Sequence, residues 1–273
     1  MLKMGLKTTI FLLFFSGLIL LSSCENAEDK ILTINTNMGF IKVKLYNETP
    51  MHRDNFVRLA KEGYYDGILF HRVINGFVIQ AGDPESKHAR PGMILGNNDI
   101  DHVVKSEIRS DLFHRRGVLA AARQEDHVNP DRNSSGGHFY IVQGKQYSPG
   151  ELDSMVNVIN ERRRLGIFRQ ISGKYEADIQ RFTAQNNLEE LEKLTKQISA
   201  ESRSLFDQVQ LVLTQEQKEI YTTQGGIPGL DGLYTVFGEV IEGMDVVDRI
   251  ALLKTDEYNR PEEDVIILKI EMQ

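Results

Sequence analysis

The sequence contains no tryptophan and only one cysteine, Cys24, among its 273 residues. A single thiol cannot close an internal disulfide, so the packing of the core must hold this fold together. Positive charge is also scarce, because 32 lysines and arginines stand against 39 acidic residues and leave a net charge of −7. A chain with this balance is a poor partner for nucleic acid, and we expect none.

Signatures of several enzyme classes are missing as well. The sequence has no Gly-rich phosphate loop and no Gly-x-Ser-x-Gly turn, which disfavours nucleotide enzymes and hydrolases. Its seven histidines lack the spacing of a metal site, so we expect no metal ion. The remaining composition, 41% hydrophobic and 26% charged, is that of a globular protein with one large domain or two smaller ones.

The first residues have the pattern of an export signal. Lys3 and Lys7 precede an apolar run over residues 10–21, which is too short to span a bilayer comfortably. The run ends in Leu-Ser-Ser-Cys, which resembles the lipobox of bacterial lipoproteins. We therefore expect residues 1–23 to be a signal peptide, Cys24 to be lipidated, and residues 24–30 to be an acidic tether. The alternative is an unmodified Cys24 after an ordinary signal peptide.

This pattern predicts an extracytoplasmic protein, anchored by lipid to a bacterial membrane on its periplasmic face or at the cell surface. The sequence leaves the choice between these two faces open.

Alternating apolar residues predict a mainly β fold. Residues 31–46 read as a hairpin with one wet face, and strand-like runs recur at 117–122, 138–143, 233–240 and 264–272. Thr49 and Pro50 form an N-cap and N1 pair that starts a short helix, and a second helix is expected over 244–253. About eight strands with helices at two ends predict a closed antiparallel barrel.

A central stretch combines two strands with an unusual charge. Apolar runs flank the pair Asn75-Gly76, which is a strong signal for a tight hairpin turn. The first of these strands carries Arg72 on an otherwise apolar face, and burying an unpaired guanidinium is expensive. Arg72 is either functional or an edge-strand residue whose stem lets the charge reach water.

Residues 145–224 have a different composition and contain no strand-like run. Helix-start signals occur at Ser148, Asn187 and Thr214. Apolar residues recur every seven positions along the longest helix, namely at Leu191, Ile198, Leu205 and Val212. We expect a helical hairpin or three-helix bundle inserted in the barrel, and favour it over an intermolecular coiled coil.

Two separated motifs resemble the cyclophilin-type peptidyl-prolyl isomerases. Residues 70–83 read Phe-His-Arg-Val-Ile-Asn-Gly-Phe-Val-Ile-Gln-Ala-Gly-Asp, and residues 229–240 read Gly-Leu-Asp-Gly-Leu-Tyr-Thr-Val-Phe-Gly-Glu-Val. The resemblance covers residues 31–144 and 225–273, and it implies a closed eight-stranded barrel capped by two helices. It also implies isomerase activity on proline-containing segments of unfolded or folding proteins, without a cofactor.

The resemblance assigns roles to individual residues. Arg72 falls on the family's catalytic arginine and Gln80 on the glutamine that orients it. The remaining assignments concern substrate binding: Phe77, Val78 and Leu230 match the proline pocket, Ala122 and Arg123 a backbone ledge for the peptide, and His138, Tyr140 and Tyr234 further pocket positions. The last three depart from the usual glutamine, phenylalanine and histidine, and Gly229 stands where the family often has tryptophan.

These residues suit catalysis of rotation about the X-Pro bond, whose barrier is about 18–20 kcal/mol. Arg72 could donate a hydrogen bond to the prolyl nitrogen, whose lone pair becomes available only in the transition state. The competing interpretation is a chaperone or peptide-binding scaffold with little turnover. The departures at Gly229, His138 and Tyr234 favour it slightly, whereas the presence of Arg72, Phe77 and Gln80 favours an enzyme.

Overall fold

The computed structural model describes residues 29–273. The predicted signal peptide and the lipidation site Cys24 lie outside this range, and of the predicted tether only Asp29 and Lys30 lie within it. Within residues 29–273, none of the helices combines the length and apolarity that a membrane span requires.

Eight antiparallel strands form one sheet, as the alternation predicts. Their order is β10-β1-β2-β9-β6-β8-β4-β3. The strands are β1 (Lys30–Thr36), β2 (Gly39–Leu45), β3 (Arg72–Val73), β4 (Val78–Ala81), β6 (Val118–Ala121), β8 (Phe139–Val142), β9 (Val236–Glu242) and β10 (Ile267–Met272). A separate pair, β5 (Val103–Val104) and β7 (Ser134–Ser135), lies in the loops.

The prediction of a closed barrel is wrong, because the sheet is a half-barrel whose two end strands, β10 and β3, do not pair with each other among the described residues. Irregular backbone before β3 lies against β10 instead. Gly67 N–H donates to Ile267 O at 2.8 Å, and Ile267 N–H donates to Ile68 O at 2.8 Å. Gly67 has φ +82°, which is incompatible with an extended strand and interrupts regular pairing here.

The concave side of the sheet holds the main core. The alternate residues Leu32, Ile34, Ile41, Val43 and Leu45 are all fully buried there, each worth about 1.5–3 kcal/mol relative to exposure. Helices α1 (Pro50–Lys61) and α6 (Met244–Ala251) pack against this core through Phe56, Leu59, Val247 and Ile250. Two short 3₁₀ turns, η1 (Pro84–His88) and η2 (Pro228–Leu230), complete the barrel.

Helix α1 starts where predicted, with Thr49 at the N-cap and Pro50 at N1, but the side chain of another residue caps its first N–H groups. The Thr49 hydroxyl makes no cap hydrogen bond and has no partner. Glu107 instead accepts from the backbone N–H groups of Met51 at 3.1 Å and His52 at 2.9 Å. A carboxylate at this end also interacts favourably with the helix dipole.

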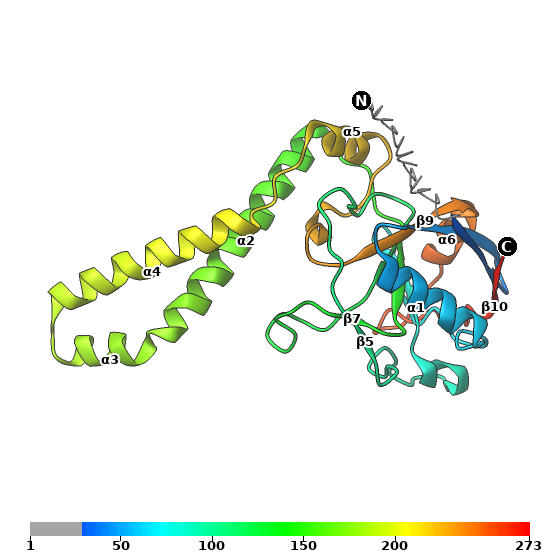
Figure 1. Cartoon of the computed structure of the whole chain (residues 1–273), viewed down its shortest axis with the longest axis horizontal. Helices are drawn as coiled ribbons and strands as arrows, with labels where there is room; N and C mark the ends of the chain where they lie inside the picture. The colour runs from blue at the N-terminus through cyan, green and yellow to red at the C-terminus, as the bar shows by residue number, and fades with distance from the viewer. Residues whose placement is uncertain (1–28) are drawn as a thin grey trace, which may run out of the picture.

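A helical arm, residues 149–223, projects from the barrel (Figure 1). It consists of α2 (Pro149–Lys174), α3 (Glu176–Ala184), α4 (Leu188–Val209) and α5 (Gln215–Thr223). Helices α2 and α4 run side by side as a hairpin, α3 lies at the far end, and α5 lies near the barrel (Figure 1).

The three predicted helix starts in the arm are confirmed. Ser148 and Thr214 form capping boxes, and the Asn187 side chain accepts from Glu190 N–H. Helix α3 was not predicted from a cap signal, and it begins after Tyr175 without a side-chain cap. Val212 does not belong to the apolar stripe, because α4 ends at Val209 and Val212 is 71% exposed.

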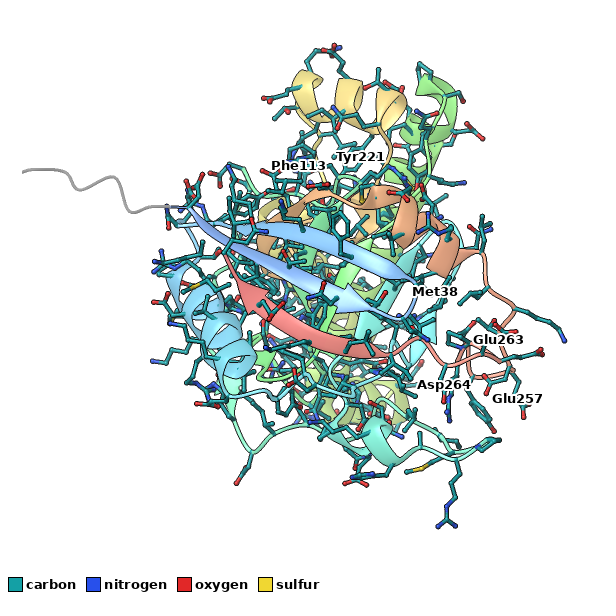
Figure 2. The ribbon with its side chains drawn as sticks, turned by 90° about the vertical axis from the view of Figure 1, so that its right-hand side faces the viewer. Met38, Phe113, Tyr221, Glu257, Glu263 and Asp264 are labelled. Carbon is teal, nitrogen blue, oxygen red and sulfur yellow. The ribbon has the colours of Figure 1, made fainter. Side chains whose placement is uncertain are left out.

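The base of the arm is tied firmly to the barrel. Lys145 and Gly226 form an antiparallel bridge where the two ends of the insertion meet. Figure 2 shows Phe113 of the barrel and Tyr221 of α5 together at this junction, with ring centroids 5.6 Å apart. Tyr221 is fully buried, so the arm contributes to one continuous packed interface with the barrel.

Candidate active site

The candidate site lies on the outer face of the half-barrel. Strands β4, β6 and β8 turn one face to the main core and the other to a second apolar cluster that contains Val78, Ala120, Tyr140 and Val142. A hollow of about 490 Å³, open to solvent, lies beside this cluster. Its lining comprises Arg72, Phe77, Val78, Gln80, Ala122, Arg123, Tyr140, Leu230 and Tyr234.

Strand register places the polar and aromatic members of this lining in one row. Arg72 pairs with Gln80 between β3 and β4, and Gln80 pairs with Tyr140 between β4 and β8. Residues that pair directly across strands project from the same face of a sheet. The row therefore places Arg72, Gln80 and Tyr140 side by side, and Tyr140 forms the aromatic wall of the hollow.

The predicted hairpin holds Arg72 in this row. Ile74 N–H donates to Val78 O at 3.0 Å, and Gly76 adopts φ +72°, which suits glycine in a tight turn. Gly76 N–H also donates to the Gln143 side chain at 2.6 Å. The turn is thus fixed to the rest of the sheet.

Arg72 is half-buried and faces the hollow. Its Nη1 donates to Gln80 Oε1 at 3.2 Å, and its guanidinium lies 5.6 Å from the Phe77 ring centroid. It forms no ion pair with any residue in 29–273. Burial lowers the pKa of Arg72, but a guanidinium remains charged at neutral pH. Most of its donors are therefore free for a ligand.

A buried hydrogen-bond chain supports the aromatic wall. The Tyr140 hydroxyl is 3.0 Å from His114 Nε2, and His114 Nδ1 is 3.1 Å from Asp231 Oδ1. An ionised Asp231 carboxylate can only accept, so Nδ1 donates to it, and in the neutral imidazole Nε2 then accepts from Tyr140. Burial raises the pKa of the Tyr140 hydroxyl well above its usual value, which keeps the proton on this donor.

The same chain reaches the helical arm. Tyr221 of α5 donates its hydroxyl proton to Asp231 Oδ2 at 2.7 Å. Asp231 Oδ1 also accepts from the backbone N–H of His114 at 2.8 Å. Both carboxylate oxygens are thus occupied, and the arm is linked to the pocket wall through two intermediate side chains.

The two residues of the predicted backbone ledge, Ala122 and Arg123, differ in whether their main chain is free to bind a peptide. Ala122 N–H donates to His138 O at 3.1 Å, and Ala122 O accepts from Ser135 N–H at 2.9 Å. The main chain of Arg123 makes no hydrogen bond within the described part of the chain. Arg123 stacks its guanidinium over Tyr234 at 4.8 Å, which leaves its backbone as the available edge for a peptide.

His138 does not join the other predicted residues. Its Nε2 lies 2.6 Å from the Asn98 carbonyl, and its ring packs 5.3 Å from the ring of His71. It lines a neighbouring hollow together with Gln80, Ala122 and Arg123. The loop that carries Asn98 draws the imidazole away from the pocket.

The sequence reasoning missed the supporting residues of the wall. Asp231 lies inside the second motif, where an acidic residue amid apolar neighbours was a signal for a buried polar partner. His114 and Tyr221 gave no such signal, because they meet Asp231 only through the fold.

Comparison with known proteins decides the family. Residues 31–161 and 212–272 match the family model described as "Cyclophilin type peptidyl-prolyl cis-trans isomerase/CLD". The chain belongs to the cyclophilin family. It is therefore a peptidyl-prolyl cis-trans isomerase, and the segment left unmatched, residues 162–211, lies within the helical arm.

Curated bacterial relatives agree with this cyclophilin assignment. A Staphylococcus haemolyticus protein named as a peptidyl-prolyl cis-trans isomerase is 30% identical over 89% of this chain and 90% of its own length. A Staphylococcus aureus protein of the same name is 28% identical over 91% of this chain and 94% of its own. A Streptococcus pyogenes protein, named as a bifunctional phosphatase and isomerase, is 31% identical, and this cyclophilin spans 40% of its length.

Solved structures show the same fold. A crystal structure of a cyclophilin-type isomerase from Cryptosporidium parvum superposes with a TM-score of 0.52 at 20% identity, covering 90% of this chain and 98% of that one. A structure of the same protein in the presence of the dipeptide Ala-Pro gives a TM-score of 0.51.

Proposed function

We propose that this cyclophilin accelerates X-Pro rotation by stabilising the transition state through Arg72. Amide resonance must break for rotation, and the prolyl nitrogen then becomes pyramidal with an available lone pair. A guanidinium placed beside it can donate a hydrogen bond that the planar ground state cannot accept. The interaction is stronger in the transition state, which is the condition for catalysis.

The observation that carries the proposal is the placement of a half-buried arginine, which makes no ion pair within residues 29–273, in a hollow that also has aromatic and aliphatic walls. Phe77, Val78, Tyr140 and Leu230 would hold the proline ring and exclude water. Removing water strengthens the hydrogen bond from Arg72. Gln80 would keep the guanidinium aimed at the prolyl nitrogen without neutralising its charge.

Activity of an Arg72→Ala variant tests this mechanism. Loss of one such donor is expected to lower kcat/KM on an Ala-Pro-Phe peptide by about 10²–10³-fold, measured by protease-free cis/trans exchange. Arg162→Ala is the matched control, because Arg162 is an exposed arginine of α2. Equal losses in the two variants would contradict the proposal.

We further propose that the isomerase works outside the cytoplasm, anchored by lipid on Cys24, on proline-containing segments of folding proteins. The apolar run over residues 10–21 and the following Leu-Ser-Ser-Cys support this location. In a bacterial host, wild-type protein should sediment with membranes and Cys24→Ser should remain soluble or unprocessed. Identical fractionation and identical processing of both would contradict lipidation.

A second function is favoured by the surface of the arm, which carries exposed apolar side chains. Val158, Leu165 and Phe168 of α2 are 50%, 45% and 43% exposed and lie on one side of the helix. They are a candidate holding surface for unfolded clients, in addition to the isomerase pocket.

A further inference from the structure

A second hollow, which the isomerase mechanism does not use, lies where the helical arm meets the barrel. Its volume is about 770 Å³, which includes space open to solvent. Its walls come from α2, from the segment after α4, from the loop after η2, and from two barrel loops near residues 110 and 132. It exists only because the arm is present.

The lining combines cationic and apolar side chains. Arg109, Arg132 and Arg163 contribute guanidinium groups, and Leu112, Leu211 and Leu233 contribute apolar surface. Asp231 also lines the hollow, but its carboxylate accepts from His114 and Tyr221 and is 8% exposed as a residue. A ligand in this hollow therefore contacts both guanidinium groups and leucine side chains.

Two of these arginines already pair with a carboxylate. Arg109 makes a two-pronged pair with Asp111 at 3.0 and 2.9 Å. Arg132 pairs with Asp126 at 2.9 Å and also donates to Gly232 O at 3.0 Å. Arg109 thus has a carboxylate of its own, whereas Arg132 shares Asp126 with Arg123.

Arg163 differs from them because it has no carboxylate partner within residues 29–273. Its Nη1 donates to Val209 O at 2.6 Å and its Nη2 to Asp231 O at 3.2 Å. Three of the five guanidinium N–H groups are left over. The carbonyls at the end of α4 compensate its charge only in part. Burial, followed by the charge of Arg132, lowers the pKa of Arg163, while the charge of Asp231 opposes the shift.

The hollow is adjacent to the proline pocket. Leu230 and Tyr234 line the proline pocket, whereas residues 231–233 between them line the arginine hollow. One short loop therefore separates the two. A bound polypeptide has to leave the proline pocket in both directions, and each extended residue adds about 3.3–3.6 Å of reach.

We propose that the arginine hollow is a second subsite for the client chain and binds the carboxylate of a glutamate or aspartate side chain a few residues from the isomerised proline. Arg163 supplies the charge-assisted hydrogen bonds, and the leucines contact the stem of the acidic side chain. The proposal rests on the proposed function, because it assumes that the client's proline occupies the Arg72 pocket.

The test uses the full-length protein and peptides that carry one Ala-Pro bond. A single glutamate is moved through positions about two to six residues on either side of the proline, and each peptide is matched by its glutamine counterpart. We measure peptide affinity by fluorescence anisotropy and kcat/KM by exchange NMR. At the best position, glutamate should bind at least about tenfold more tightly than glutamine.

Variants of the arm assign the effect. Arg163→Gln should abolish the glutamate preference and leave the glutamine peptides unchanged, whereas Arg162→Gln, its neighbour on the exposed side of α2, should retain the preference. Arg163→Lys keeps the charge and should retain part of it even if the glutamine variant folds poorly.

Absence of any position where wild-type protein prefers glutamate would overturn the subsite, as would equal loss in Arg162→Gln and Arg163→Gln. Failure of the Arg72 mechanism gives a different result. Arg72→Ala would then isomerise normally while the glutamate preference in binding remained.

Discussion

At the scale of single residues, the site depends on a charged side chain with a neutral partner. Gln80 fixes Arg72 through one hydrogen bond of 3.2 Å and leaves its positive charge uncompensated. A carboxylate at the same position would hold the guanidinium more tightly and would oppose its donation to a substrate nitrogen. Under the proposed mechanism, the pairing of arginine with glutamine in this motif has an electrostatic reason.

His71, next to Arg72, is expected to contribute to the pH dependence of stability. It is 3% exposed, and within residues 29–273 both ring nitrogens lack a hydrogen-bond partner. Burial, followed by the nearby His138, lowers its pKa to about 3, while Asp83 opposes the shift. The unfolded chain therefore takes up this proton first, and stability falls as pH decreases from about 6.5 toward 3.

Between pH 7 and pH 5, uptake of a proton by His71 in the unfolded chain should lower the free energy of unfolding of the wild type by about 2 kcal/mol. We predict that His71→Phe lacks this decrease. Urea unfolding at the two pH values measures it. His127→Gln is the control, since its side chain is 72% exposed. The interpretation fails if His71→Phe loses as much stability on acidification as wild type.

At the scale of elements, residues close in sequence predict the hairpin turn and several helix starts, whereas features that depend on contacts distant in sequence could not be predicted. The hairpin at Asn75-Gly76 and the helix starts at Ser148, Asn187 and Thr214 follow from residues within four positions of each other. The cap of α1 comes from Glu107, more than fifty residues away, and no local pattern reveals it.

The site shows the same division. Nine predicted pocket residues line one hollow because strand register places them there. His138 lies in the neighbouring hollow because a loop carbonyl, that of Asn98, binds its imidazole. The half-barrel likewise departs from the predicted closed barrel at Gly67, whose φ of +82° is outside the range of an extended strand.

Glycines at the base of the arm allow a close crossing of backbones. A Cβ on Gly226 would lie 2.3 Å from the His114 carbonyl oxygen, and φ there is +152°. In contrast, a Cβ on Gly166, within α2, would meet nothing within 4 Å. Gly226 therefore leaves no room for a side chain, whereas Gly166 does.

We predict that Gly226→Ala destabilises the protein by several kcal/mol through the clash and the strained backbone. Gly166→Ala should stabilise it by about 0.5–1 kcal/mol, because alanine favours helix. Thermal unfolding compares the two. Equal effects of both substitutions would show that the crossing is not tightly packed.

At the scale of the whole molecule, the arm combines two kinds of surface. The side of α2 that faces α4 buries Ile171 with Leu194 and Ile198. Its other side exposes Val158, Leu165 and Phe168, so apolar residues occur on both sides of one helix. Helix α2 starts at the barrel (Figure 1) and contacts η2, which carries the pocket residue Leu230.

We predict that replacing Val158, Leu165 and Phe168 together with serine weakens suppression of aggregation of a large unfolded client by half or more. Exchange on a short Ala-Pro-Phe peptide should be unchanged, because these side chains are not part of the pocket lining. A control replaces Glu161 and Arg164, an exposed ion pair of the same helix, with glutamine. Unchanged suppression by the serine variant would mean that the arm does not hold clients.

The central claim is that Arg72 acts on the transition state more than on the bound peptide. Exchange NMR at saturating Ala-Pro-Phe peptide, with a parallel titration for affinity, separates the two effects in Arg72→Ala. We predict that kcat falls about 10²–10³-fold while the dissociation constant changes less than about tenfold. An unchanged kcat, with only weaker binding, would contradict the mechanism.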